Sequence, residues 1–422
     1  MNFFWRENSY SLTLYMIPVS AAISFIDQNV EQLGTETVSI SDVVNRILAE
    51  DIVADMDLPP FDRSQMDGFA VRAADIANAP IDLKLIGESA AGHGWHTEMH
   101  PGETVRIMTG APVPPGADAV QKVELTSEHN FGSEDSQKTD GTITILEPVA
   151  PGRNIVRQGA EVRKGEMIFR SGERINERVI ATLAAVGYSS VTVANRPRVT
   201  IFTTGSEVVE INETPGRDQI RNSNSAMLQA LVKEVGGEVT LLPTAPDDLD
   251  GIKHVIQNAA LSSDLVVITG GVSVGKYDLT KRAMQELGAE LFFERVRLKP
   301  GKPAVFARLD KALLFGLPGN PVSAAVTFYL FVRKALLLMQ NASETDLPRA
   351  TAIAGDTLKA APQRDSYIPA KLQFGSDGAL TVEPVKWIGS SDFIAFGKSD
   401  ALVFVPGGEV RESGDRIEVL LI

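Results

Sequence analysis

The sequence predicts a multidomain α/β protein with a doubly wound parallel sheet and small β domains, including a C-terminal β-barrel. Strand-like and helix-like apolar patterns alternate regularly through residues 196–345, which is typical of a parallel sheet covered by helices. Short apolar runs between Gly and Pro turns fill residues 51–151 and indicate an inserted β-rich domain. Alternating strand patterns in residues 346–422 indicate the barrel. The chain of 422 residues is longer than one hydrophobic core usually serves.

The remaining segments are predicted to extend and link these domains. Residues 1–16 are expected to be a disordered extension, because Arg6 and Glu7 interrupt a stretch too short and too polar for a signal peptide or membrane span. Residues 17–50 look helical, and with residues 152–195 they are expected to form a mixed α/β linking domain. The cytoplasm is therefore the expected compartment.

Within the sheet domain the elements follow one another with clear start and stop signals. The predicted strands are 199–202, 238–242, 264–268, 304–306 and 313–315, and the predicted helices are 224–235, 249–260, 279–287 and a long helix from Pro321. Ligands of doubly wound sheets bind outside the carboxyl ends of the strands. The loops that follow these strands are therefore where we expect the functional residues.

Composition excludes several classes of function. A net charge of −14 argues against broad nucleic-acid binding, which needs a basic surface. The absence of Cys excludes disulfides, thiolate metal sites and cysteine nucleophiles. The five His residues are scattered and form no metal or triad motif. An anionic ligand would have to be held by backbone N–H groups and a few lysines.

The strongest local pattern is the glycine-rich loop from Thr269 to Asp278. It follows an apolar strand and opens a helix, so its backbone can approach an anion closely and offer free N–H groups. Its anion-binding candidates are Gly270, Gly271, Ser273 and Gly275. The spacing imitates a P-loop, but Tyr277 stands where Mg²⁺ binding requires Ser or Thr. A nucleotide-hydrolysing P-loop and a plain tight turn remain the alternatives.

Two further strand ends carry similar loops. In the loop of residues 316–323, Asn320 is predicted to be the N-cap of a helix and Pro321 its first residue. A well-capped, rigid helix start is therefore the purely structural alternative to ligand binding. The candidates in this loop are Pro318, Gly319, Asn320 and Pro321. Thr204 and Gly205 end the first strand of the domain in the same way. The repetition within one sheet favours ligand binding.

Charged residues accompany these loops. Lys299 and Lys302 lie on a proline-stiffened loop and form a candidate cationic clamp for a phosphate or oxyanion, although paired lysines are often merely solvated. Glu207, Asp247 and Asp278 are candidate ligands of a divalent cation, most simply Mg²⁺, because hard cations prefer oxygen. For Asp278, which directly precedes a helix, capping is the competing explanation.

Five motifs in order resemble one family, the molybdopterin molybdenumtransferases, which include bacterial MoeA proteins and the E domain of gephyrin. The motifs are Phe61–Gly68, Met108–Pro112, Gly270–Gly275, Lys299–Pro303 and Leu317–Pro321. The match covers roughly residues 17–422. The residue types in Phe61–Gly68 and Met108–Pro112 do not by themselves indicate a function.

The resemblance implies a MogA-like sheet domain and insertion of molybdate into adenylylated molybdopterin, with Mg²⁺, releasing AMP and molybdenum cofactor. It implies that Asp67, Thr109 and Lys299 are active-site residues, together with the acidic residues of the sheet domain. It also implies that Pro318 and Pro321 shape the pterin pocket. At position 161 similar proteins tend to have Asp, where this chain has Glu161.

The resemblance further implies an elongated homodimer with an active site composed from both subunits, and the upstream molybdopterin adenylyltransferase as a candidate partner. Two other functions remain open. The sheet domain alone is also compatible with that adenylyltransferase activity, and gephyrin-type proteins act as scaffolds. The sequence does not decide between molybdate and tungstate.

Overall fold

The computed structural model describes residues 16–128, 141–271, 279–376 and 378–422. The chain divides into two compact units. One comprises the chain up to Glu50, Ser171–Ala181 and Ser189–Ile422, and the other comprises Asp51–Arg170 and Thr182–Tyr188. Each unit has its own hydrophobic core, and each is described by itself.

The first unit is built on a six-stranded sheet in the order β15-β12-β16-β20-β19-β17. Its strands are β12 (Arg198–Thr203), β15 (Glu238–Leu241), β16 (Leu265–Thr269), β17 (Glu290–Phe293), β19 (Val305–Leu309) and β20 (Ala312–Leu317). The first four in spatial order are parallel, as expected. β19 runs antiparallel to β20, and β17 runs antiparallel to β19, so the sheet is mixed rather than wholly parallel. The reason is a tight turn at Asp310, whose φ of 53° lets the chain return directly along its neighbour.

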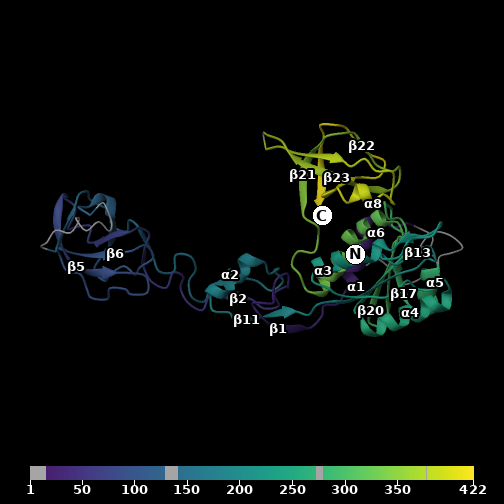
Figure 1. The fold of residues 1–422 in the computed structure, drawn as a ribbon, viewed down its shortest axis with the longest axis horizontal. Helices are drawn as coiled ribbons and strands as arrows, with labels where there is room; N and C mark the ends of the chain where they lie inside the picture. Colours follow the sequence, from purple (N-terminus) through teal and green to yellow (C-terminus); the bar gives the residue numbers. More distant parts are fainter. Residues whose placement is uncertain (1–15, 129–140, 272–278, 377) are drawn as a thin grey trace, which may run out of the picture. The chain divides into compact units, whose positions relative to one another are not determined.

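Helices cover both faces of this sheet, because its central strands are apolar on both sides. In β16, Leu265 and Val267 face one core while Val266 and Ile268 face the other. The first core is covered by α1 (Val19–Asn29), α3 (Ser223–Glu234) and the helix that begins at Pro321, and the second by α4 (Leu249–Ser262) and α5 (Leu279–Glu286) (Figure 1). This three-layer arrangement confirms the predicted doubly wound class.

The helix predicted from Pro321 is long and almost wholly apolar. It comprises α6 (Pro321–Thr327), one π-helical turn η3 (Phe328–Val332) and α7 (Arg333–Met339). Among the described residues, it is the one helix long and apolar enough to span a membrane, but it is 83% buried within the protein. Its apolar surface is therefore accounted for by the core of the sheet domain.

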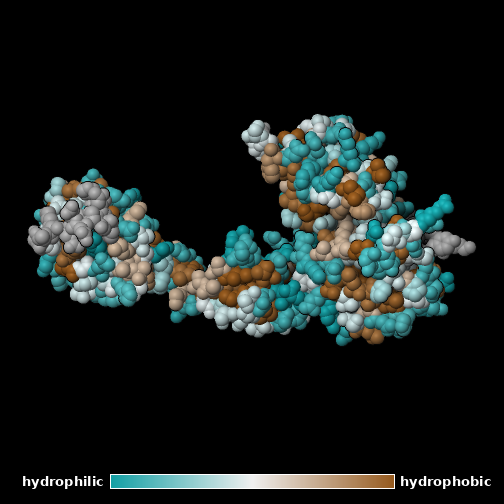
Figure 2. Space-filling view, viewed as in Figure 1, coloured by the Kyte–Doolittle hydropathy of each residue, from teal (hydrophilic) through white to brown (hydrophobic). Residues whose placement is uncertain are grey.

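The C-terminal part of the same unit is the predicted β-barrel. It closes in the order β23-β24-β21-β27-β25, because β25 also pairs with β23. Its elements are β21 (Arg349–Ala354), β22 (Leu358–Lys359), β23 (Asp365–Phe374), β24 (Leu380–Pro384), α8 (Phe393–Phe396), β25 (Ala401–Val405), β26 (Val410–Arg411) and β27 (Arg416–Leu421). A short strand from the sheet domain, β18 (Leu298–Lys299), pairs with β23 and ties the two folds together. Ile388, shortly before α8, and Ile394, within it, are exposed. Figure 2 shows hydrophobic (brown) surface on this part of the protein.

The prediction of helix through residues 17–50 is correct only for α1. The chain then forms β1 (Thr35–Ser39), which pairs antiparallel with β11 (Ser190–Ala194). β-Branched residues favour strands and lower helix propensity, and Thr35, Thr37 and Val38 follow one another closely here. A pairing partner more than 150 residues away along the chain decided the conformation, and the local apolar pattern did not reveal it. The predicted helix that stops at Gly187 is α2 (Glu177–Ala185).

The second unit is built on a five-stranded sheet in the order β7-β4-β6-β5-β8. Its elements are β2 (Ile52–Val53), β3 (Arg63–Ser64), β4 (Gly68–Val71), β5 (Ile81–Ser89), β6 (Glu103–Ile107), β7 (Ala119–Lys122), η2 (Val123–Leu125), β8 (Thr142–Ile145), β9 (Ile155–Val156) and β10 (Met167–Phe169). Phe69 and Val71 are fully buried between the strands. The β-rich character predicted for this part of the chain is what the structure shows.

Candidate active site

Three of the predicted glycine loops meet at one edge of the large sheet. They follow β12, β16 and β20, which are adjacent and parallel, so their carboxyl ends lie side by side. Backbone hydrogen bonds join them. Thr204 N donates to Thr269 O at 3.0 Å, and Gly270 N donates to Leu317 O at 3.1 Å. The structure thus brings together the predicted residues Thr204, Gly205, Gly270, Gly271 and Gly319.

Close approach explains the glycines of this edge. Gly270 has a φ of +95°, and a Cβ there would lie 2.5 Å from the backbone oxygen of Thr204. Gly271 has a φ of +62°, and its Cβ would lie 2.6 Å from Thr280 Oγ1. Gly319 lies against this loop, because its Cβ would be 3.6 Å from the Cα of Gly270. A side chain at Gly270 or Gly271 would therefore force the loops apart.

The helix start after β20 is as predicted in position but not in its hydrogen bonds. Asn320 is the N-cap residue and Pro321 is the first helical residue, yet the Asn320 side chain makes no capping bond. Instead its Nδ2 donates to Ser390 Oγ at 2.9 Å, and Val322 N donates to Ser390 O at 3.0 Å. The barrel segment that carries Ser390 satisfies the helix start, and Asn320 remains exposed at the edge of the sheet. Nothing local in the sequence indicated that Ser390 would lie here.

Two asparagines that were not predicted to belong to the site lie directly behind these loops. Asn222 caps α3 by accepting from Ser225 N at 3.0 Å, and its Nδ2 donates to Thr203 Oγ1 at 3.2 Å. Asn224 is only 8% exposed, and its Nδ2 donates to both Thr269 Oγ1 and Gly319 O. The available signal was the run Asn222-Ser223-Asn224 at a helix start, because such residues favour caps over helix interiors.

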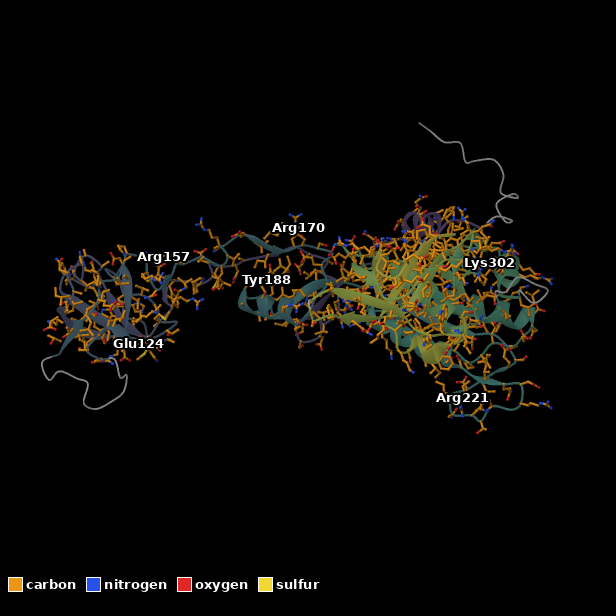
Figure 3. All side chains as sticks on the ribbon, turned by 90° about the horizontal axis from the view of Figure 1, so that it is seen from above. Glu124, Arg157, Arg170, Tyr188, Arg221 and Lys302 are labelled. Atoms are coloured by element: carbon orange, nitrogen blue, oxygen red, sulfur yellow. The ribbon has the colours of Figure 1, made fainter. Side chains whose placement is uncertain are left out.

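The lysine loop reaches the same edge because of the antiparallel strand. Val305, the first residue of β19, pairs with Gly316 near the end of β20, so the loop that precedes β19 lies beside the loop that follows β20. Lys299 is exposed, and Lys302 (labelled in Figure 3) is half-buried. Within the described part of the chain, neither ammonium group has a carboxylate within ion-pair distance. The two lysines are thus available to an anionic ligand.

The structure describes two of the three predicted carboxylate residues. Glu207 and Asp247 are exposed, and the Glu207 carboxylate bends back over Gly205, with Oε2 2.6 Å from where a Cβ of that glycine would be. Asp247 follows Ala245, whose N donates to Thr203 O at 2.8 Å, so both acids flank the end of β12. Asp278, Ser273 and Gly275 lie outside the described residues. Among the residues described, no three His, Asp or Glu side chains are grouped closely enough to hold a metal ion.

In the second unit the structure brings the predicted Asp67 and Thr109 into contact. Asp67 directly precedes β4 and Thr109 follows β6, and these strands are antiparallel neighbours, so both residues lie at the same end of the pair. Asp67 Oδ1 accepts from Thr109 N at 2.7 Å and from Thr109 Oγ1 at 3.0 Å. Both side chains are exposed, so a carboxylate held in a fixed orientation faces solvent.

The neighbouring motif residues pair with the chain that returns past them. Arg63 Nη2 lies 2.9 Å from Glu161 Oε1, and Arg157 Nη1 lies 2.5 Å from Asp62 Oδ2 (Arg157 is labelled in Figure 3). Glu161, whose role the sequence left open, is thus the ion-pair partner of Arg63. Because both side chains are substantially exposed, this pair contributes little stability.

The described geometry is that of an α/β protein whose parallel strand ends form a glycine-lined, lysine-flanked edge suited to an anionic ligand, with a β-barrel joined to the same edge. Three family matches follow one another along the chain. Residues 17–187 match the MoeA N-terminal region (domain I and II), residues 200–337 a probable molybdopterin binding domain, and residues 351–422 the MoeA C-terminal region (domain IV).

Similar proteins cover nearly the whole chain. A molybdopterin molybdenumtransferase of Staphylococcus aureus (strain COL) is 37% identical over 96% of this chain and 95% of its own length. The one of Bacillus subtilis (strain 168) is 35% identical over 96% and 94%. The crystal structure of the molybdopterin biosynthesis protein MoeA from Pyrococcus horikoshii OT3 superposes with a TM-score of 0.81 at 32% identity, covering 97% of this chain and all of the other. The chain belongs to the MoeA family of molybdopterin molybdenumtransferases, which confirms the resemblance.

Proposed function

We propose that this protein inserts molybdate into adenylylated molybdopterin, releasing AMP and forming molybdenum cofactor. One observation carries the proposal. Three glycine loops and a lysine loop with no described carboxylate partner converge on one sheet edge, in a chain whose relatives are named molybdopterin molybdenumtransferases. Both substrates are anions, and backbone N–H groups with fixed lysines are suited to hold them.

The proposed reaction needs positioning and charge neutralisation more than a nucleophilic side chain. Breaking a phosphoanhydride spreads negative charge over the phosphate oxygens, which cations and backbone donors stabilise. In the proposal Gly270 and Gly271 keep the loop backbone close to the phosphate, and Lys299 and Lys302 stabilise the oxyanions. Pro318 and Pro321 give the pterin a rigid wall.

We further propose a Mg²⁺ ion bound by Glu207, Asp247 and Asp278. The first two fit such an ion, since they are exposed carboxylates at the end of one strand without an ion-pair partner in the described chain. Bound Mg²⁺ would neutralise phosphate charge during cleavage. AMP release that continues at the full rate in excess EDTA would remove the metal from the proposal.

The test of the function is a direct assay. Purified protein is incubated with adenylylated molybdopterin, molybdate and Mg²⁺, and AMP is measured over time. The proposal expects release that requires both molybdate and the divalent cation, and parallel reactions with tungstate define the metal preference. Formation of adenylylated molybdopterin from ATP and molybdopterin, without molybdate-dependent release of AMP, would favour the adenylyltransferase. If neither activity is found, a gephyrin-like scaffold remains as the alternative function.

We also propose a cytoplasmic homodimer in which Asp67 and Thr109 of one subunit complete the site formed by the sheet domain of the other. The two groups of residues belong to different compact units, so a site that contains both needs two units to come together, from one chain or from two. A two-fold dimer would then have two identical sites. The upstream adenylyltransferase is the proposed partner that delivers the substrate.

The composite site is tested by mixing two inactive variants. Asp67→Ala and Asp278→Ala are allowed to exchange subunits, and random pairing makes about half the dimers heterodimers. Each heterodimer has one doubly altered and one intact site, so activity should return to about a quarter of wild type. No recovery after verified exchange would show that each subunit forms its own site.

A further inference from the structure

A buried amide joins the loops of the candidate site. Asn224, in the first turn of α3, donates through Nδ2 to Thr269 Oγ1 at 2.8 Å and to Gly319 O at 2.8 Å. Thr269 Oγ1 in turn donates to Pro318 O at 3.0 Å. These three bonds connect α3 to the ends of β16 and β20, which carry two of the glycine loops.

The link acts at the point where those loops touch. Gly319, whose carbonyl Asn224 holds, lies directly against Gly270. The oxygen of the same amide, Asn224 Oδ1, is buried and has no hydrogen-bond partner in the described chain. Thr204 Oγ1, buried beside the same glycines, also lacks one. A buried polar atom without a partner costs stability, so each of these two atoms calls for an explanation, and both lie where the two glycine loops meet.

We propose that Asn224 is a positioning residue of the active site. It fixes the spacing between the loops at Gly270 and Gly319, and thereby the geometry in which their backbone groups meet the substrate. The link is independent of the proposed reaction, which enters only through the activity measurement. Displacement of catalytic groups by about 1 Å is enough to lower a rate a hundredfold, so a link of this kind can control activity without contacting the reacting atoms.

The chain contains a matched control. Gln340 is completely buried, donates through Nε2 to Val235 O at 2.8 Å and Leu336 O at 2.9 Å, and also leaves its side-chain oxygen unpaired. Val235 is the residue after α3, roughly 16 Å along the helix from Asn224 at 1.5 Å per residue. Asn224→Leu and Gln340→Leu therefore remove the same chemistry at opposite ends of one helix.

Two measurements on the full-length variants decide the proposal. Amide hydrogen exchange should be faster around residues 316–321 and 270–271 in Asn224→Leu, and around residues 235–237 in Gln340→Leu. The kcat/KM for AMP release should fall at least tenfold in Asn224→Leu and stay within twofold of wild type in Gln340→Leu. Unchanged exchange at residues 316–321, or equal activity of the two variants at equal folded fraction, would overturn the proposal.

A second pair of variants covers the case in which Asn224→Leu does not fold. Thr269→Val removes the hydroxyl that accepts from Asn224, whereas Thr269→Ser retains it. Thr269→Val should reproduce the faster exchange and the tenfold loss, and Thr269→Ser should restore both; equal behaviour of the two would contradict the link. If wild type itself released no AMP, the proposed function would fail, and the exchange measurements would still decide the role of Asn224.

Discussion

Replacing Gly270 with Ala should separate the strain of a glycine conformation from the close contact that the site requires. The Gly270 backbone has a φ of +95°, and an added Cβ would lie 2.5 Å from the backbone oxygen of Thr204. Contacts below 3.0 Å are essentially never found for real Cβ atoms, so the two strand ends must open by at least 0.5 Å. Gly288 provides the control, because its φ is +80° and a Cβ there would meet nothing within 4 Å.

The two substitutions share one cost and differ in another. A non-glycine residue at such a φ costs about 1–3 kcal/mol, and both variants incur that cost. Only Gly270→Ala adds the overlap with Thr204, and relieving an overlap in a packed region costs about 1–3 kcal/mol more. The free energy of unfolding should thus fall by about 2–6 kcal/mol in Gly270→Ala and by about 1–3 kcal/mol in Gly288→Ala.

Urea denaturation and AMP release measured on the same preparations test this reasoning. Gly288→Ala should keep wild-type activity, since its loop lies away from the ligand edge. Gly270→Ala should lose about a hundredfold in kcat/KM, because the displaced loop no longer presents its backbone groups in register. If both variants lose the same free energy and keep the same activity, the close approach of the loops at Gly270 has no functional role.

Lys299→Ala should raise the molybdate concentration for half-maximal AMP release about tenfold to a hundredfold. The control Lys311→Ala, in the exposed turn after β19, should leave that concentration unchanged. An unaltered value for Lys299→Ala would show that Lys299 is only a surface charge. Thr109→Val removes the hydrogen bond from the Thr109 hydroxyl to Asp67 but keeps the one from the Thr109 backbone N–H. We expect kcat to fall about tenfold, while the free energy of unfolding changes by less than about 0.5 kcal/mol. A wild-type kcat would contradict this expectation. Burial raises the pKa of Tyr329 to about 12, and the unfolded phenol ionises near pH 10. The stability that the neutral phenol provides is therefore complete below pH 10 and lost as pH rises towards 12. Of that loss, Tyr329→Phe should remove about 1 kcal/mol between denaturant titrations at pH 9 and pH 11. Identical titrations of the two proteins would show that Tyr329 does not ionise on unfolding.

The sequence alone was sufficient to predict the class of fold and the positions of the glycine loops in the sheet domain. Strands such as β16 are apolar up to their last residue and are followed by Gly and a helix start, so their type and approximate limits could be predicted from local pattern alone. Glycines with positive φ at strand ends, such as Gly270 and Gly271, also leave a local signal. Asp67 and Thr109 were identified only through the resemblance, because two exposed polar residues 42 positions apart carry no pattern of their own.

Tertiary structure decided what depends on the pairing of distant segments. Residues 35–39 form a strand rather than a helix because β11 supplies their hydrogen-bond partners. Asn224 and Ser390 join the candidate site because the ends of α3 and of a barrel segment are brought to the carboxyl edge. The lysine loop shows the principle most clearly. In a wholly parallel sheet a loop that precedes a strand lies at the opposite edge from the ligand. Only the antiparallel direction of β19, set by the tight turn at Asp310, brings the loop that precedes β19 and carries Lys302 to the edge where the glycine loops lie.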